Sequence, residues 1–295
     1  MGLPLFADER IAMPLAFSTL GCPGDSLEQV IATAHASGAT GVELRAADGE
    51  FVFPSMDAAG RAHVAGTLAA AGITVLALAS YVRVCAVPHE GVGVNDPVLA
   101  ELLAAVDLAA DLSAAQVRVF PGAGVEPCGP GEEPSAELLA ADQHGAARLN
   151  AAAAHARARG VSMLLETHDS HPRAQDIVRI LAHVDADAPV QVIWDLMHPW
   201  RYDEAPARTA ELLADSLAYA QYKDGVRQQG TNAVSLTLPG AGELPLAQMR
   251  DLVAGILATR GTTEPWISLE WERAWHPTLP PVAQALESLK AVLAP

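Results

Sequence analysis

Short runs of apolar residues alternate along the chain with longer segments in which apolar residues recur every three or four positions. A continuous apolar run of about four to eight residues is typical of a strand buried on both faces, and the longer pattern is typical of an amphipathic helix. This pattern predicts eight strands, at 14–19, 41–45, 73–80, 116–122, 161–168, 190–195, 217–224 and 266–272.

A helix is predicted after each strand, at 26–38, 57–71, 97–113, 136–159, 173–184, 205–214, 245–260 and from the last strand to 293. Eight strand–helix units in a chain of 295 residues indicate a parallel sheet closed into a (β/α)8 TIM barrel, with residues 1–295 as one domain. A doubly wound sheet is the alternative. It is disfavoured because LGCPGD, which follows the first strand, is not the GxGxxG loop of dinucleotide-binding folds.

The segment 63–82 has no Asp, Glu, Lys or Arg and is long enough to cross a bilayer. Gly72 divides it into an Ala-rich half and a β-branched half, so we expect a helix, a glycine cap and a buried strand. The first residues show no secretory signal, and three cysteines without a CxxC pair favour a reducing compartment. We therefore expect a cytoplasmic protein, and the high Ala content suggests a bacterial source.

The formal net charge is −17, from 35 acidic and 18 basic residues. Such a surface repels phosphate backbones and anionic lipids, so we expect neither a nucleic-acid nor a membrane partner. A small substrate remains compatible with this charge. The chain is apolar enough for a homodimer or a homotetramer.

Polar residues gather where the predicted strands end, which is the end of a barrel that carries catalytic groups. Glu166, Asp195 and Glu270 follow strands five, six and eight, and strand seven ends in Gln221. Three carboxylates and a fourth ligand from strand seven suit a hard, oxygen-preferring cation. A single acid at a strand end is more often an ion-pair partner or a helix cap, so the prediction depends on the coincidence across four strands.

These segments resemble the sugar-phosphate isomerase/epimerase-like barrels, also called xylose isomerase-like TIM barrels. The resemblance covers nearly the whole chain and is carried by GVELR, LLETHDS, WDLMH, QYKD, LPGAGELPL and WISLEWE. It implies that Glu166, Asp195 and Glu270 bind a divalent metal and that His198 contacts substrate hydroxyls. Mn²⁺ is the first expectation, with Mg²⁺, Co²⁺ or Zn²⁺ as alternatives.

Strand seven departs from the family pattern, because many members have His where this chain has Gln221. A Gln side-chain oxygen can still bind a hard cation. Some dehydratase-type relatives have a Gln here, so this departure bears on the type of reaction.

Further substrate-binding candidates are His168, Glu43, Lys223, Arg201 and Glu272. Glu43 is equally well explained by an ion pair with Arg45, and Lys223 by an ion pair with Asp224 or Glu270. Arg83 and Arg273 join Arg201 as candidates for an anionic substrate group.

The resemblance implies an isomerase or epimerase of a carbohydrate-like substrate such as a sugar, an inosose or a keto-polyol. Glu166 and Glu270 would move a proton next to a carbonyl through a cis-enediolate. A lyase of the same superfamily is the alternative, acting on a 3-dehydroshikimate-like or 3-keto-glycoside substrate. A non-catalytic sugar-binding barrel is a third hypothesis, and the negative charge disfavours a fourth, an apurinic endonuclease.

Overall fold

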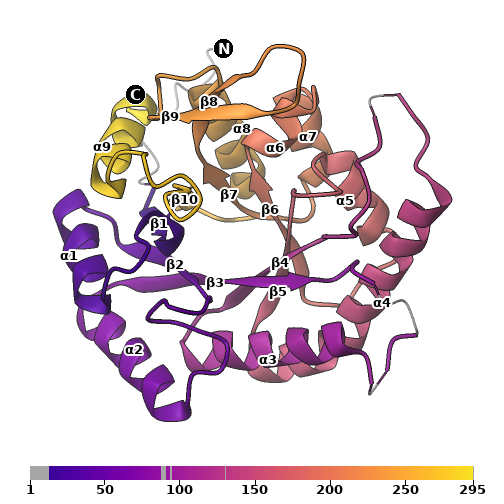
Figure 1. Cartoon of the computed structure of the whole chain (residues 1–295), viewed down its shortest axis with the longest axis horizontal. Helices are drawn as coiled ribbons and strands as arrows, with labels where there is room; N and C mark the ends of the chain where they lie inside the picture. Colours follow the sequence, from indigo (N-terminus) through magenta and orange to yellow (C-terminus); the bar gives the residue numbers. More distant parts are fainter. Residues whose placement is uncertain (1–12, 88–90, 94, 130, 295) are drawn as a thin grey trace, which may run out of the picture.

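The structure is a computed structural model that describes residues 13–294 except 88–90, 94 and 130. Eight parallel strands close into a barrel in the order β1-β10-β7-β6-β5-β4-β3-β2, and helices surround it (Figure 1). The predicted (β/α)8 barrel is therefore confirmed. The barrel strands are β1 (Leu15–Ser18), β2 (Gly41–Arg45), β3 (Thr74–Arg83), β4 (Gln116–Phe120), β5 (Ser162–Glu166), β6 (Val190–Asp195), β7 (Leu217–Tyr222) and β10 (Ile267–Leu269).

The predicted helices are present within a few residues of their expected bounds. They are α1 (Leu27–Ser37), α2 (Ala58–Ala70), α3 (Pro97–Asp111), α4 (Ala136–Arg159), α5 (Ala174–Leu181), α7 (Pro206–Leu213), α8 (Leu246–Thr259) and α9 (Val282–Leu293). Four further elements were not predicted. One is the short 3-10 helix η1 (Thr19–Gly21), which follows β1. The short helix α6 (Met197–Arg201) follows β6, and the antiparallel strands β8 (Asp224–Arg227) and β9 (Val234–Thr237) form a hairpin between β7 and α8.

Segment 63–82 contains the helix end and the strand that its composition predicts. Helix α2 ends at Ala70, Gly72 has the positive φ of 72° that glycine adopts readily, and β3 begins at Thr74. Within the described part of the chain, none of the helices combines the length and the apolar character that crossing a membrane requires.

Alternate residues of each strand point into the barrel, which separates its interior into layers. One layer is apolar and consists of Ala16, Leu76, Ala77, Leu164, Ile193 and Tyr219. Two residues further along β5, β6 and β7, the same interior face carries Glu166, Asp195 and Gln221. The alternation of the strands therefore places polar groups directly above a closed apolar floor.

Asp224 ties the hairpin to the segment before α8. Its buried carboxylate accepts hydrogen bonds from the backbone N–H groups of Gly225, Gly240, Gly242 and Leu244 at 2.8–3.1 Å. A Cβ at Gly242 would collide with this carboxylate, so the close approach requires glycine. Asp224 is thus a structural residue that shapes the rim of the barrel.

Candidate metal centre

Three carboxylates meet at the carboxyl end of the barrel. Glu166 ends β5, Asp195 ends β6, and Glu270 follows β10 directly. All three are buried, and their ligand oxygens lie within 4.8 Å of one another. The structure therefore brings together the three acids that the sequence singled out, in an arrangement that could hold one cation.

Gln221 lies beside these acids on β7. Its amide Nε2 donates to Glu43 at 2.9 Å and to Glu270 at 3.4 Å, while its Oε1 makes no hydrogen bond to a described residue. Glu166 Oε1 is also buried and without a hydrogen-bond partner among the described residues. Unsatisfied buried acceptors are unfavourable, and a divalent cation would satisfy them, so this donor set fits an oxygen-ligated metal.

Arg118 is the functional residue that the sequence prediction missed. It lies on β4, is buried, and places Nη1 3.2 Å from Glu166 Oε2 and 3.6 Å from Glu270 Oε1. Its guanidinium also packs 4.1 Å from the ring centre of Phe120. The sequence indicated Arg118 only through one charge inside the apolar run QVRVF, at one of the alternate positions that face the barrel interior.

Lys223 supplies a second positive charge. Its ammonium lies 2.6 Å from a carboxylate oxygen of each of Asp195, Glu270 and Glu272. Burial alone would lower the pKa of Lys223, but these three acids raise it well above 10.5. The predicted pairing with Glu270 is present, whereas Asp224 is turned toward the loop described above.

The protonation of Glu166 follows from its surroundings. Burial raises its pKa well above 4.5; Arg118 opposes the shift, and Glu270 and Asp195 reinforce it. A bound cation would reverse this balance, because it favours the carboxylate over the protonated acid.

Two histidines lie next to the acids. His168 Nδ1 is 2.8 Å from Asp169 Oδ1, and the ring centres of His168 and His198 are 4.5 Å apart. His198 Nε2 lies 3.3 Å from Asp195 Oδ2. Burial, His168, Arg201 and Lys223 together lower the pKa of His198 well below 6.5, so its imidazole is neutral near pH 7.

Glu43 lies deeper in the barrel than the sequence prediction implied. It is fully buried and accepts hydrogen bonds from Tyr219 at 2.8 Å, from Gln221 at 2.9 Å and from Ser268. It is not among the described residues that line the cavity, and Arg45 pairs with Glu50 at 2.5 Å. Its substrate-binding role stays a prediction, and its observed contacts are to the barrel interior.

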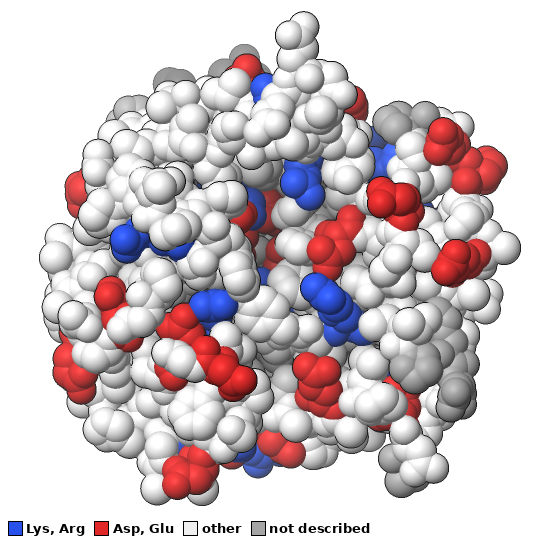
Figure 2. All heavy atoms as spheres, in the orientation of Figure 1, with Lys and Arg blue, Asp and Glu red and all other residues white. Residues whose placement is uncertain are grey.

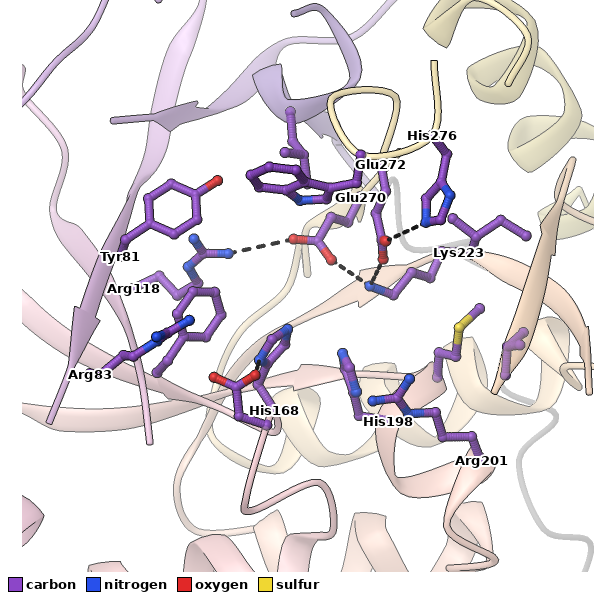
Figure 3. A pocket seen from close by; sticks show the side chains of 17 residues that line it. Tyr81, Arg83, Arg118, His168, His198, Arg201, Lys223, Glu270, Glu272 and His276 are labelled. Atoms are coloured by element: carbon purple, nitrogen blue, oxygen red, sulfur yellow. Dashed lines mark hydrogen bonds and ion pairs between the residues drawn. The ribbon is translucent and has the colours of Figure 1, made fainter. Parts of the chain in front are cut away.

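A cavity of about 360 Å³ lies at the barrel mouth (Figures 2 and 3). Of the three acids only Glu270 lines it, and Glu166 and Asp195 are fully buried behind its wall. His168, His198, Lys223, Arg201, Glu270 and Glu272, all predicted from the sequence, line it. Arg83 and Arg118 line it as well, but Arg273 does not. Arg83 and Arg201 form no ion pair within 4.0 Å with a described carboxylate, although the charge of Arg83 helps to lower the pKa of Asp169.

Aromatic residues around the site divide into core and wall. Trp194 and Trp271 are fully buried core residues, and the half-exposed Trp275 lies at the mouth. The ring of Trp275 contacts Tyr81 edge-on at 6.4 Å and has the Arg45 guanidinium 4.9 Å from its centre. At the mouth of the cavity, Trp275 thus contacts both an aromatic ring and a cation.

Comparison with solved structures relates this geometry to known barrels. A Clostridium cellulolyticum D-psicose 3-epimerase in complex with D-tagatose has a TM-score of 0.70 at 13% identity, covering 95% of this chain and 97% of the epimerase. A probable 3-DHS dehydratase from Bacillus anthracis has a TM-score of 0.68 at 14% identity, covering 96% of this chain and 99% of the dehydratase. These likenesses show the shared fold.

A third similar structure is a xylose isomerase-like TIM barrel/4-hydroxyphenylpyruvate dioxygenase fusion protein. It has a TM-score of 0.67 and is 21% identical over 95% of this chain. The present chain spans 42% of that fusion protein. No curated protein sequence matches the chain.

The family model described as xylose isomerase-like TIM barrel matches residues 31–292. This match covers most of the chain, including every strand that contributes an acid to the site. The chain belongs to the xylose isomerase-like TIM barrel family.

Proposed function

We propose that this protein is a divalent-cation-dependent enzyme that moves a proton next to the carbonyl of a small carbohydrate-like substrate. The observation that carries the proposal is the set of Glu166, Asp195 and Glu270, whose oxygens lie within 4.8 Å of one another, with Glu270 lining the cavity. The unpartnered Oε1 of Gln221 supports it as a fourth ligand. Four oxygen donors suit Mn²⁺ or Mg²⁺.

Glu166, Asp195, Gln221 and Glu270 would hold the cation. A bound divalent cation polarises a carbonyl and increases the acidity of the neighbouring C–H. The family resemblance and the epimerase neighbours support isomerisation as the first form of the reaction. In its epimerase form, one carboxylate accepts the proton from the carbon next to the carbonyl, and a carboxylic acid on the opposite side of that carbon returns a proton to it.

Glu166 and Glu270 are the two proton carriers in this proposal. They come from strands that β6 and β7 separate in the barrel, so they approach the substrate from different directions. Arg118 contacts both, and Lys223 contacts Glu270, so each acid is held by a cation on one side. His198 is proposed to contact a substrate hydroxyl, since its ring nitrogens lack hydrogen bonds within the described chain.

Elimination is a second candidate, favoured by the cations of the cavity. Arg83, Arg118, Arg201 and Lys223 line one small cavity of a protein with a net charge of −17. Arg118 and Lys223 are paired with the acids of the site, but Arg83 and Arg201 form no ion pair within 4.0 Å with a described carboxylate, and they favour an anionic keto substrate. His168 would take the proton from carbon, the C–H electrons would form a C=C bond, and the C–O bond would break. The hydroxide would leave as water after taking a proton from a carboxylic acid.

The test combines metal analysis with substrate turnover in D₂O. Purified protein is assayed for bound metal, and the Mn²⁺-loaded enzyme is incubated with neutral ketoses and with cyclic keto acids. Deuterium in recovered ketose supports isomerisation, whereas a new ultraviolet-absorbing alkene supports elimination. For either reaction, EDTA is expected to abolish turnover.

Variants identify the residues involved. Glu270→Gln is expected to lower turnover by about 100-fold or more, because general acid–base groups contribute at least this much. Asp195→Ala and Gln221→Ala are expected to lose bound metal, and His63→Gln, on the exposed face of α2 outside the cavity, is the control. Full turnover in Glu270→Gln would contradict the two-carboxylate mechanism. Wild-type protein that takes up no metal even after reconstitution would favour the non-catalytic barrel.

A further inference from the structure

His168 and His198 form a second group of possible ligands around Glu166. One ligand atom from each of these three residues lies within 4.8 Å of the others. His168 lies two residues beyond β5 and His198 lies in α6, which follows the neighbouring strand β6, and Figure 3 shows both rings at the cavity. This group contains two nitrogen donors, whereas the acids described above contribute only oxygen.

His198 is the residue that points to a ligand. Its side chain is 7% exposed, and Nδ1 has no hydrogen-bond partner among the described residues, while Nε2 lies 3.3 Å from Asp195 Oδ2 without forming a hydrogen bond. A buried polar atom without a partner costs about 1–3 kcal/mol. Together with the unpartnered Oε1 of Glu166, it leaves donor atoms of two kinds available at one place.

His168 is held in the orientation of a metal ligand. Its Nδ1 faces Asp169 at 2.8 Å, which leaves Nε2 for a cation. A carboxylate behind the second ring nitrogen is the usual support of a metal-binding histidine. The ring also stacks near Phe120, with 4.3 Å between ring centres.

The turn that carries His168 is rigid. Its backbone pairs with that of His171 through two hydrogen bonds, and Asp169 between them has a φ of 48°. The buried side chain of His171 is fixed by Asp142 at 2.6 Å and by Ser170 at 2.9 Å. His168 is therefore positioned before any ion binds, which favours binding.

From this geometry we infer a second cation site, formed by Glu166, His168 and His198, that binds Zn²⁺ or Co²⁺. Two imidazoles and one carboxylate suit these borderline metals, and three protein ligands leave a position open toward the cavity. The site is separate from the four-oxygen set and shares only Glu166 with it. A carboxylate can bridge two cations in this way.

Zinc in this second site removes both imidazoles from contact with a substrate. The Mn²⁺-loaded enzyme is therefore inhibited by excess Zn²⁺, while excess Mg²⁺, which prefers oxygen ligands, has no such effect. This consequence rests on the proposed function. The existence of the site does not, because it can be measured by metal binding alone.

The experiment is a metal titration of the full-length, metal-stripped protein. Wild type is expected to bind two equivalents of Co²⁺ but one equivalent of Mn²⁺, measured by elemental analysis after desalting. His168→Gln is expected to bind one Co²⁺, with loss of the stronger visible absorption that nitrogen ligands and low coordination give. His276→Gln, the control at the rim, is expected to keep two.

Glu270→Gln separates the two sites, because it changes the oxygen set and leaves the histidines intact. Suppose that wild type binds one Co²⁺, that Glu270→Gln loses it and that His168→Gln keeps it. This result overturns the second site and leaves the proposed function standing. Conversely, Co²⁺ binding that depends on His168 in a protein that binds no Mn²⁺ supports the second site and contradicts the proposed function. Retention of two equivalents of Co²⁺ in both His168→Gln and His198→Gln also overturns the second cation site.

Discussion

Arg118 and Lys223 place two positive charges among four carboxylates of Glu166, Asp195, Glu270 and Glu272. Without a bound cation, these side chains are the countercharges that offset part of the cost of burying the acids, although burial still raises the pKa of Glu166. Removing one member of a buried ion pair leaves an uncompensated charge, which is far more unfavourable than losing a surface pair.

Arg118→Met tests this role. In the presence of EDTA we expect the free energy of unfolding to fall by about 3–5 kcal/mol, because Glu166 and Glu270 remain buried without the guanidinium. Saturating Mn²⁺ is expected to recover part of the loss, since the ion provides the missing charge. Urea unfolding with and without Mn²⁺ measures both values. An equal loss in the two conditions would contradict the assignment, and Arg83→Met serves as the unpaired control.

Glu43 leads to a prediction on pH. Burial raises its pKa above 4.5, so the folded protein keeps a proton that the unfolded chain releases. Its contribution to stability is fully present below pH 4.5 and is lost as the pH rises through the folded-state pKa. Relative to Glu43→Gln, metal-free wild type should therefore lose stability as the pH rises from 4.5. Urea unfolding of both proteins at pH 5 to 8 measures this difference, and a difference that is constant or of opposite sign would refute it.

At the scale of elements, the sequence predicted the strands and three of the acids for one physical reason. Strands of a covered parallel barrel are continuous apolar runs, and their carboxyl ends share one face, so acids at several strand ends must converge. Arg118 could not be predicted in the same way. Its charge lies in the middle of an apolar run, and Glu270 is 152 positions further along the chain.

The hairpin and α6 escaped prediction because local sequence carries little signal for them. Helix α6 has five residues, including Pro199, which is too short to show periodicity. The segment 224–237 is largely polar and resembles a loop, and its pairing depends on the carboxylate of Asp224. The contacts of Asp224 to Gly240, Gly242 and Leu244 were not evident from its position after strand seven.

Asp224→Asn tests the hairpin anchor. We expect a loss of about 2–4 kcal/mol in unfolding free energy, because the amide keeps one acceptor oxygen and turns an N–H₂ group toward backbone donors. Metal binding is expected to remain, since Asp224 faces away from the acids. Gly242→Ala should have a similar effect through collision with the same carboxylate. Gly255→Ala in α8, where a Cβ meets no other atom within 4 Å, is the matched control and should be neutral or stabilising.

At the scale of the whole molecule, the four-oxygen set connects strands from half of the barrel, β5 to β10. A ligand that binds only the folded protein stabilises it by about 2.7 kcal/mol at a concentration of 100 times its Kd. We therefore expect Mn²⁺ to raise the unfolding temperature and EDTA to remove the increase, as followed by circular dichroism. Asp195→Ala should abolish the increase, and a shift that persists in this variant would place the cation elsewhere.

The four hydrogen bonds to Asp224 also bear on how the rim fluctuates. Surface connections normally open often, and their amide protons exchange with solvent quickly. The amides of Gly240, Gly242 and Leu244 all donate to one buried carboxylate, so they can exchange only when the hairpin and the segment before α8 separate together. In a hydrogen–deuterium exchange experiment the amide protons of these three residues should exchange slowly and at similar rates, as the amide protons of a barrel strand do.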